Sequence, residues 1–228
     1  MEILVPFRRV VRKQILENQV NGDRTSCLGG SWSAYGDGVE DYDDSFREVL
    51  GGKDIASIIK TRRSPVVIDL MSPSDRLANL FSQVPNKRKL GIAVSLEDLR
   101  SDEKKQADKD MDIRQIAGDI LKFSTWREID QALQDRKADL IIERALDGLS
   151  LIPQYKILYG TILRKIWNIL SKENGIFLFQ VPRESIDMSL WIWTRIFKEY
   201  KIDVLGEGSQ FMKIVKTPDS PIELPLLR

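Results

Sequence analysis

The sequence of 228 residues contains no histidine and a single cysteine, Cys27. The absence of imidazole excludes every nucleophile that depends on a histidine partner, and it removes the commonest metal ligand. One cysteine can form neither an intramolecular disulfide nor a cysteine-cluster zinc site, which is typical of a reducing compartment. We therefore expect a cytoplasmic protein and assign no metal ligand.

Long apolar runs are also missing. The apolar stretch at the start, Met1–Pro6, is too short for a signal peptide, and no segment approaches the roughly 18 apolar residues of a membrane span. The 35 Lys and Arg residues nearly equal the 34 Asp and Glu residues, so no overall field attracts nucleic acid or membrane. We therefore expect neither a membrane nor a nucleic acid as partner.

What the chain does contain is an alternation of short apolar runs with amphipathic segments. From Pro65 onward the apolar runs are predicted to be parallel strands covered on both faces, and the segments between them to be helices. The charged segment 97–112 is predicted to be a mobile connection or a solvated helix. The predicted strands are Val66–Leu70, Leu90–Ser95, Ile113–Ala117, Ala138–Ile142 and Ile176–Val181, followed by Ile202–Leu205 and Phe211–Val215 around a glycine turn.

This order indicates an α/β fold with a doubly wound, mostly parallel sheet and a C-terminal antiparallel hairpin. Upstream, an amphipathic helix is predicted over 7–20, a glycine-rich loop over 25–38, and two short helices over Tyr42–Leu50 and Asp54–Lys60. A long helix is predicted from Pro153 to a stop at Asn174-Gly175.

Acidic residues and glycines recur at the ends of the predicted strands. The first strand ends in Asp69-Leu70, the third continues as Ala117-Gly118-Asp119-Ile120, and Asn174-Gly175 precedes the fifth. Together with the apolar fourth strand, these features resemble the class I S-adenosylmethionine-dependent methyltransferases. The resemblance covers residues 65–217. It implies a Rossmann-like methyltransferase domain over 61–228, preceded by an N-terminal helical or lid segment over 1–60.

Two positions depart from the pattern of that family. The family has a glycine-rich turn after its first strand, and this chain has Met71-Ser72-Pro73-Ser74-Asp75 there. The family also places an acid at the end of its second strand to hold ribose, where this chain offers Ala93 or Ser95. Two functions therefore stay open: a methyltransferase acting on a small molecule, and a methyltransferase-like protein without catalysis that serves as a binding or scaffolding module.

The resemblance implies a site for S-adenosylmethionine at the carboxyl ends of the strands. The hydroxyls of Ser72 and Ser74, or the backbone amides of the following helix, would bind the cofactor's carboxylate. Ribose would be held by Ser95, or by Glu97 and Asp98. The implied cofactor-binding residues are Asp69, Met71, Ser72, Ser74, Ser95, Gly118, Asp119, which would face the adenine amino group, Ile120 and Glu143.

A general base is optional in this chemistry, because alignment alone accelerates an in-line methyl displacement. If the acceptor is a hydroxyl or a protonated amine, Glu143 is the best-placed catalytic base and Asp147 the second. The alternative is that Glu143 is a surface carboxylate paired with Arg144. Arg144 is also a candidate for orienting an anionic substrate.

Aromatic residues occur in two further places. Trp32 and Tyr35 lie in the glycine-rich segment, where they either bind the substrate or adenine by stacking or anchor this segment to the sheet. Trp191 and Trp193 belong to a dense apolar cluster, which is typical of a core or of a homodimer surface.

Other enzyme classes fit less well. A nucleotide-dependent oxidoreductase needs a glycine fingerprint for the pyrophosphate, and none follows Leu70. A nucleic-acid methyltransferase is disfavoured by the near-neutral charge and by Glu143–Leu146, which stands where base-methylating enzymes carry an Asn or Asp-Pro-Pro-aromatic motif. A small-molecule acceptor is therefore the expectation.

Overall fold

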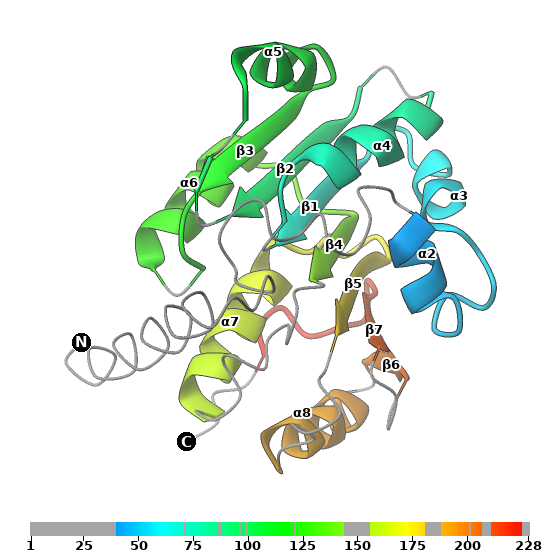
Figure 1. Cartoon of the computed structure of the whole chain (residues 1–228). Helices are drawn as coiled ribbons and strands as arrows, with labels where there is room; N and C mark the ends of the chain where they lie inside the picture. The colour runs from blue at the N-terminus through cyan, green and yellow to red at the C-terminus, as the bar shows by residue number, and fades with distance from the viewer. Residues whose placement is uncertain are drawn as a thin grey trace, which may run out of the picture.

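The computed structural model describes residues 40–70, 72–85, 88–95, 97–98, 100–120, 122–143, 156–180, 188–200, 202–206 and 211–224, with side chains at all of these except 40–41, 156–159 and 188–193. The helix and loop predicted within 1–39 lie outside these residues. The elements (Figure 1) are α2 (Glu40–Phe46), α3 (Ile55–Lys60), β1 (Val66–Leu70), α4 (Asp75–Gln83), β2 (Leu90–Ser95), α5 (Asp102–Asp110), β3 (Ile113–Ala117), α6 (Phe123–Leu133), β4 (Leu140–Glu143), α7 (Lys156–Ile169), β5 (Gly175–Gln180), α8 (Met188–Glu199), β6 (Asp203–Leu205) and β7 (Phe211–Lys216).

The strands of the described part of the chain form one sheet in the order β3-β2-β1-β4-β5-β7-β6. The five strands from β3 to β5 pair in parallel, and β7 is antiparallel to both β5 and β6. The predicted α/β fold is confirmed, with its mostly parallel sheet and C-terminal antiparallel hairpin. β7 lies inside the sheet and β6 at its edge.

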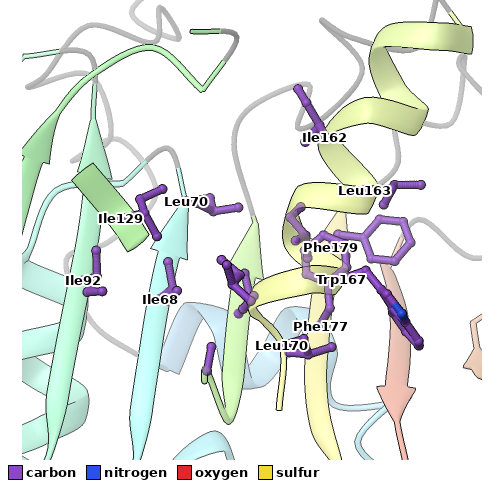
Figure 2. Close-up of a cluster of buried hydrophobic side chains, with 14 of the residues drawn as sticks. Ile68, Leu70, Ile92, Ile129, Ile162, Leu163, Trp167, Leu170, Phe177 and Phe179 are labelled. Carbon is purple, nitrogen blue, oxygen red and sulfur yellow. The ribbon is translucent and has the colours of Figure 1, made fainter. Parts of the chain in front are cut away.

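Helices cover both faces of the sheet, which explains why the central strands are almost wholly apolar. On one face α6 and α7 pack over β1, β2 and β5, and Figure 2 shows side chains such as Leu70 and Phe179 directed toward these helices. On the other face α2, α3 and α4 pack over the same sheet (Figure 1), with Phe46 and Leu77 in the second cluster. Every residue of β1 and β2 is buried as a result.

The N-terminal helices α2 and α3 are part of this packing. Tyr42, Phe46 and Ile59 are almost completely buried against the sheet. The Asp54 side chain caps α3 by accepting a hydrogen bond from the Ser57 amide at 2.5 Å. The division of the chain after residue 60 stays a prediction.

Two predicted helices end earlier than expected, and one predicted charged segment contains a helix. The helix predicted over Tyr42–Leu50 ends at Phe46 and continues as a turn. The helix predicted to stop at Asn174 ends at Ile169, because Ala138 bonds to the backbone on both sides of Leu170 and draws the chain into the sheet. Segment 97–112 contains the solvated helix α5, but its Asp108 is fully buried. Among the described residues, no helix combines the length and apolar character that a bilayer crossing requires.

Candidate functional site

At the carboxyl end of β1, Asp69 lies in a buried polar cluster with a residue of α2. The Tyr42 hydroxyl lies 2.8 and 3.0 Å from the two carboxylate oxygens of Asp69, and it accepts a hydrogen bond from Nη1 of Arg76 at 3.1 Å. The Arg76 guanidinium also lies over the Tyr42 ring, 4.8 Å from its centroid. Burial raises the pKa of Asp69 to about 7, although Arg76 and Tyr42 act in the opposite direction. Burial and the neighbouring Asp69 also raise the pKa of Tyr42.

In the glycine-free turn after β1, the side chains of Ser72 and Ser74 point into the protein. Ser72 and Ser74 are both fully buried. The Ser72 amide donates to the carbonyl of Val94 at 2.8 Å, which extends the pairing of β1 with β2, and the Ser72 hydroxyl lies 3.5 Å from that of Tyr42. The Ser74 hydroxyl donates to Oδ2 of Asp108 at 2.5 Å. Both predicted cofactor ligands therefore use their hydroxyls within the protein.

Asp108 joins α5 to this turn. Besides Ser74, its carboxylate accepts hydrogen bonds from Arg100 at 2.8 Å and from Lys104 at 2.5 Å. Although burial opposes its ionisation, the bonds from Lys104, Ser74 and Arg100 lower the pKa of Asp108. Arg100 also holds Asp98 through Nε and Nη2 at 2.8 and 2.9 Å, which lowers the pKa of Asp98 to about 2.

At the end of β2, Ser95 is fixed by two hydrogen bonds. Its hydroxyl donates to the carbonyl of Glu97 at 2.6 Å and accepts from Nε2 of Gln115 on β3 at 2.8 Å. The Glu97 residue that follows is exposed. Asp98 is exposed as well, but its carboxylate is paired with Arg100, and the Ser95 hydroxyl is engaged within the protein.

The loop after β3 is fixed by α6. The Gly118 amide donates to the carbonyl of Ser95 at 2.7 Å, and the hydroxyl of Thr125 donates to the carbonyl of Asp119 at 2.7 Å. Nε1 of Trp126 donates to the carbonyl of Ile120 at 2.7 Å. A Cβ at Gly118 would lie 2.6 Å from Oγ1 of Thr125, so this position needs glycine for close approach. Asp119 itself is half-buried.

Glu143 and Asp69 lie on neighbouring strands but face opposite sides of the sheet. In the parallel pairing of β1 with β4, Leu70 is opposite Glu143 and Asp69 is opposite Ile142. Glu143 therefore shares the face of Leu70 and Phe179, which α6 and α7 cover, and Asp69 shares the face of α2 and α4. Glu143 is also fully buried, so the alternative of a surface carboxylate is wrong.

The remaining predicted site residues lie outside the described residues. These are Met71, Asp147, Arg144, Trp32 and Tyr35. The side chains of Trp191 and Trp193 are likewise outside the description, so the homodimer surface stays a prediction.

Sequence reasoning missed four residues that build this edge: Tyr42, Arg76, Asp108 and Gln115. Tyr42 begins a predicted short helix and Asp108 lies in a highly charged segment, so neither residue stood out in the sequence. The available signal was the buried acid Asp69, since a carboxylate on a strand covered on both faces requires a donor from a neighbouring helix.

No protein-family model and no curated protein matches the sequence. Among solved structures, a 1,6-didemethyltoxoflavin-N1-methyltransferase from Burkholderia thailandensis, with bound 1,6-didemethyltoxoflavin and S-adenosylhomocysteine, aligns with a TM-score of 0.50. Its identity is 14%, over 93% of this chain and 89% of its own. The chain has the class I methyltransferase fold.

Two longer structures align over part of their length. The MycE methyltransferase of mycinamycin biosynthesis matches at 12% identity and a TM-score of 0.47, over 78% of this chain and 46% of its own. An O-methyltransferase family protein from Burkholderia thailandensis matches at 13% identity and a TM-score of 0.41, over 78% of this chain and 58% of its own. The chain therefore spans about half the length of these methyltransferase-fold structures.

Proposed function

We propose that this protein is an S-adenosylmethionine-dependent methyltransferase that acts on a small molecule. The observation that carries the proposal is the match over nearly the whole of both chains to the 1,6-didemethyltoxoflavin-N1-methyltransferase, whose structure holds S-adenosylhomocysteine and 1,6-didemethyltoxoflavin. It is supported by acids at the carboxyl ends of three of the parallel strands, Asp69 on β1, Asp119 after β3 and Glu143 on β4, since ligands of parallel α/β sheets bind at that edge.

The residues at this edge fit the nucleoside half of the cofactor. Thr125 holds the backbone carbonyl of Asp119, and the half-buried side chain of Asp119 is the proposed partner of the adenine amino group. The exposed Glu97 carboxylate, whose backbone is fixed by Ser95, supplies the acceptor oxygens that the ribose hydroxyls need. We therefore propose Glu97 for the ribose-binding role that the sequence analysis left open between Ser95 and the pair Glu97 and Asp98.

For the amino-acid half of the cofactor, the structure favours backbone amides over the serine hydroxyls as hydrogen-bond donors. The hydroxyls of Ser72 and Ser74 are engaged within the protein, so the cofactor's carboxylate would bind the first-turn amides of α4, which have no helical acceptor. The hydrogen bond from Ser74 to Asp108 holds the start of α4 in position.

When bound, S-adenosylmethionine supplies an electrophilic methyl carbon whose bond to sulfur breaks with both electrons going to sulfur as the acceptor attacks. The protein's part is to align the acceptor and exclude water. Glu143 is proposed to take the proton that a hydroxyl or protonated amine acceptor loses, with Asp147 as the second candidate base. Trp32, Tyr35 and Arg144 remain the candidates for binding that acceptor.

A second candidate function is a binding or scaffolding module without catalysis. The observation that favours it is the filled turn after β1. Ser72 and Ser74 are both fully buried and contact other side chains, at the turn where the family has glycines beside the cofactor. Interactions of this kind stabilise the fold whether or not a cofactor binds.

Isothermal titration of the full chain with S-adenosylmethionine and S-adenosylhomocysteine distinguishes the two functions. The first predicts micromolar binding that Asp119→Ala weakens at least tenfold, because a carboxylate facing the adenine amino group is lost. Asp130→Ala is the matched control, since it removes an exposed carboxylate from the middle of α6 and should leave the affinity unchanged.

The possible results separate cleanly. Micromolar binding that depends on Asp119 and not on Asp130 supports the methyltransferase. Absence of heat at millimolar ligand overturns it and favours the module. Binding that is equally strong in Asp119→Ala overturns the assignment of the adenine end.

A further inference from the structure

The amino edge of the sheet, opposite to the candidate site, concentrates positive charge. The described segments that precede four neighbouring strands are 60–65 before β1, 84–85 with 88–89 before β2, 134–139 before β4 and 171–174 before β5. They contain eight Lys or Arg residues and three Asp or Glu residues, an excess of five in a chain with a net charge of +1. The rest of the chain is therefore net negative. We call these four segments the basic edge.

Hydrogen bonds join the segments of the basic edge into one surface. Arg62 before β1 donates to the carbonyls of Glu173 and Asn174 before β5, at 2.6 and 2.7 Å. Arg136 before β4 donates to the carbonyl of Ser64 at 2.7 Å, and the Ser64 hydroxyl donates to the carbonyl of Arg88 before β2 at 2.8 Å. Arg62 and Arg136 are therefore held at fixed positions along the edge.

Most of these partners are backbone carbonyls, which leave the positive charge in place. Lys137 donates to the carbonyl of Asn168 near the end of α7, as cations at helix C-termini commonly do. The side chains of Arg63, Arg88 and Lys172 are exposed to solvent.

The three carboxylates of the basic edge offset little of this charge. Asp139 is partly buried and is already held by the Val66 amide at 2.9 Å and by Arg62 at 3.8 Å. Asp135 and Glu173 are exposed to water, where a single carboxylate has a weak effect. At the neighbouring end of β7, burial and then repulsion from Lys137 and Lys172 lower the pKa of Lys216 to about 8. An anion bound along the edge would relieve that repulsion.

We propose that the basic edge is a docking surface for an acidic segment of a partner protein. Strands of a sheet lie about 4.8 Å apart, so four of them present cations over roughly 15 Å. An extended peptide spans that distance with about five residues. A short run of Asp and Glu residues therefore matches the edge in charge and in length, and Arg63 and Arg88 are its exposed anchors.

The composition of the edge favours a peptide over a nucleic acid or a membrane. Single-stranded nucleic acids bind by stacking bases on aromatic rings, and the described segments of the basic edge contain no aromatic residue. They also expose no large apolar side chain that could enter a bilayer. The near-neutral chain lacks the long-range field that attracts nucleic-acid polymers.

The test is fluorescence anisotropy of a labelled hexaglutamate peptide with the full chain at low salt. We expect saturable binding that weakens as salt is added, and no binding of hexalysine. The variant Arg63→Glu/Arg88→Glu should weaken hexaglutamate at least tenfold. The matched control is Arg47→Glu/Arg195→Glu, which makes the same charge change at two exposed arginines on α8 and beside α2. Circular dichroism melting checks that both variants fold.

Three outcomes overturn the proposal. The first is absence of hexaglutamate binding to the unchanged protein at millimolar peptide. The second is an equal loss in both double variants, which would reflect net charge alone. The third is tighter binding of a uridine hexanucleotide through Arg63 and Arg88, which would make the edge a nucleic-acid surface. None of these depends on S-adenosylmethionine, so the methyltransferase proposal is tested separately.

Discussion

The Tyr42 hydroxyl contacts both carboxylate oxygens of Asp69, at 2.8 and 3.0 Å, across 27 positions of sequence. Neither residue has more than 1% of its surface exposed. A buried carboxylate without donors is costly, so this contact makes Asp69 tolerable on a strand covered on both faces. It also attaches α2 to the turn that begins the candidate site.

The substitution Tyr42→Phe should therefore destabilise the fold. It removes a hydrogen bond to a buried charged group, which costs about 1–3 kcal/mol in free energy of unfolding. Urea denaturation measures this change. Tyr200→Phe is the control, because Tyr200 is 44% exposed and its loss should change stability by less than about 0.5 kcal/mol. Equal effects of the two substitutions would contradict the role given to Tyr42.

The pKa of Asp69 predicts a pH dependence of stability with a definite sign. Its carboxyl has a pKa raised from 3.8 to about 7 in the folded state, so the native protein retains a proton that the unfolded chain has lost between these values. The contribution of Asp69 is fully present below pH 3.8 and is lost as the pH rises through 7.

The variant Asp69→Asn isolates this contribution because its amide does not titrate. The free energy of unfolding of the natural protein minus that of Asp69→Asn should fall as the pH rises from 4 to 7, and stay level above that range. Urea titrations at several pH values measure this difference, in which the effects of Asp98 and Asp108 cancel. A difference that rises with pH would show that the pKa of Asp69 is lowered in the fold.

Asp108 should be among the most sensitive carboxylates outside the sheet. Asp108→Ala removes the buried acceptor of Ser74, Arg100 and Lys104, and because the two cations keep Asp98 and Asp75 as partners, we expect a cost of about 1–3 kcal/mol. Asp110→Ala in the same helix removes an exposed carboxylate that accepts one bond from Gln106, and it should have little effect. Thermal melts of the two variants compare them directly, and similar melting temperatures would refute the anchoring role of Asp108.

Gly118 and Thr125 should show a coupled effect on stability. The methyl group of Gly118→Ala would lie 2.6 Å from Oγ1 and 2.9 Å from Cγ2 of Thr125, so we expect a loss of about 1–3 kcal/mol. In a Thr125→Ala background those two atoms are gone, and the same substitution should cost clearly less. The double-mutant cycle is read from urea denaturation. Additive effects would mean that the clash is not with Thr125.

Several elements were predictable because their signals are local. The apolar runs of β1, β2 and β3 lie within the predicted bounds, and the solvated helix α5 follows from its alternating charges. The end of α7 was not predictable from the helix itself, because Ala138, which draws the chain into the sheet after Ile169, precedes that helix by 18 residues. The turn chemistry of Asn174-Gly175 was present but five residues beyond the helix.

In the candidate site too, some side chains were predictable from local sequence and others depended on distant residues. Asp69, Asp119 and Glu143 were predicted because an acid at the end of a buried strand is visible in the sequence. That Asp69 and Glu143 face opposite sides follows only from the register of β1 with β4, since a shift of one residue exchanges the two faces of a strand. The hydroxyls of Ser72 and Ser74 were expected to face a ligand, and their partners Tyr42 and Asp108 lie 30 and 34 positions away.

By itself the sequence determined the class of fold, because alternating apolar runs and amphipathic segments can be buried in few ways other than a parallel sheet covered by helices. It also determined which strand ends carry acids. Only the tertiary structure decided what a strand-end acid such as Asp69 meets, since Tyr42 reaches it across 27 positions of sequence through packing that no local pattern encodes. It also decided that cations scattered over four segments form one basic edge, because pairing of the strands brings their starting points together.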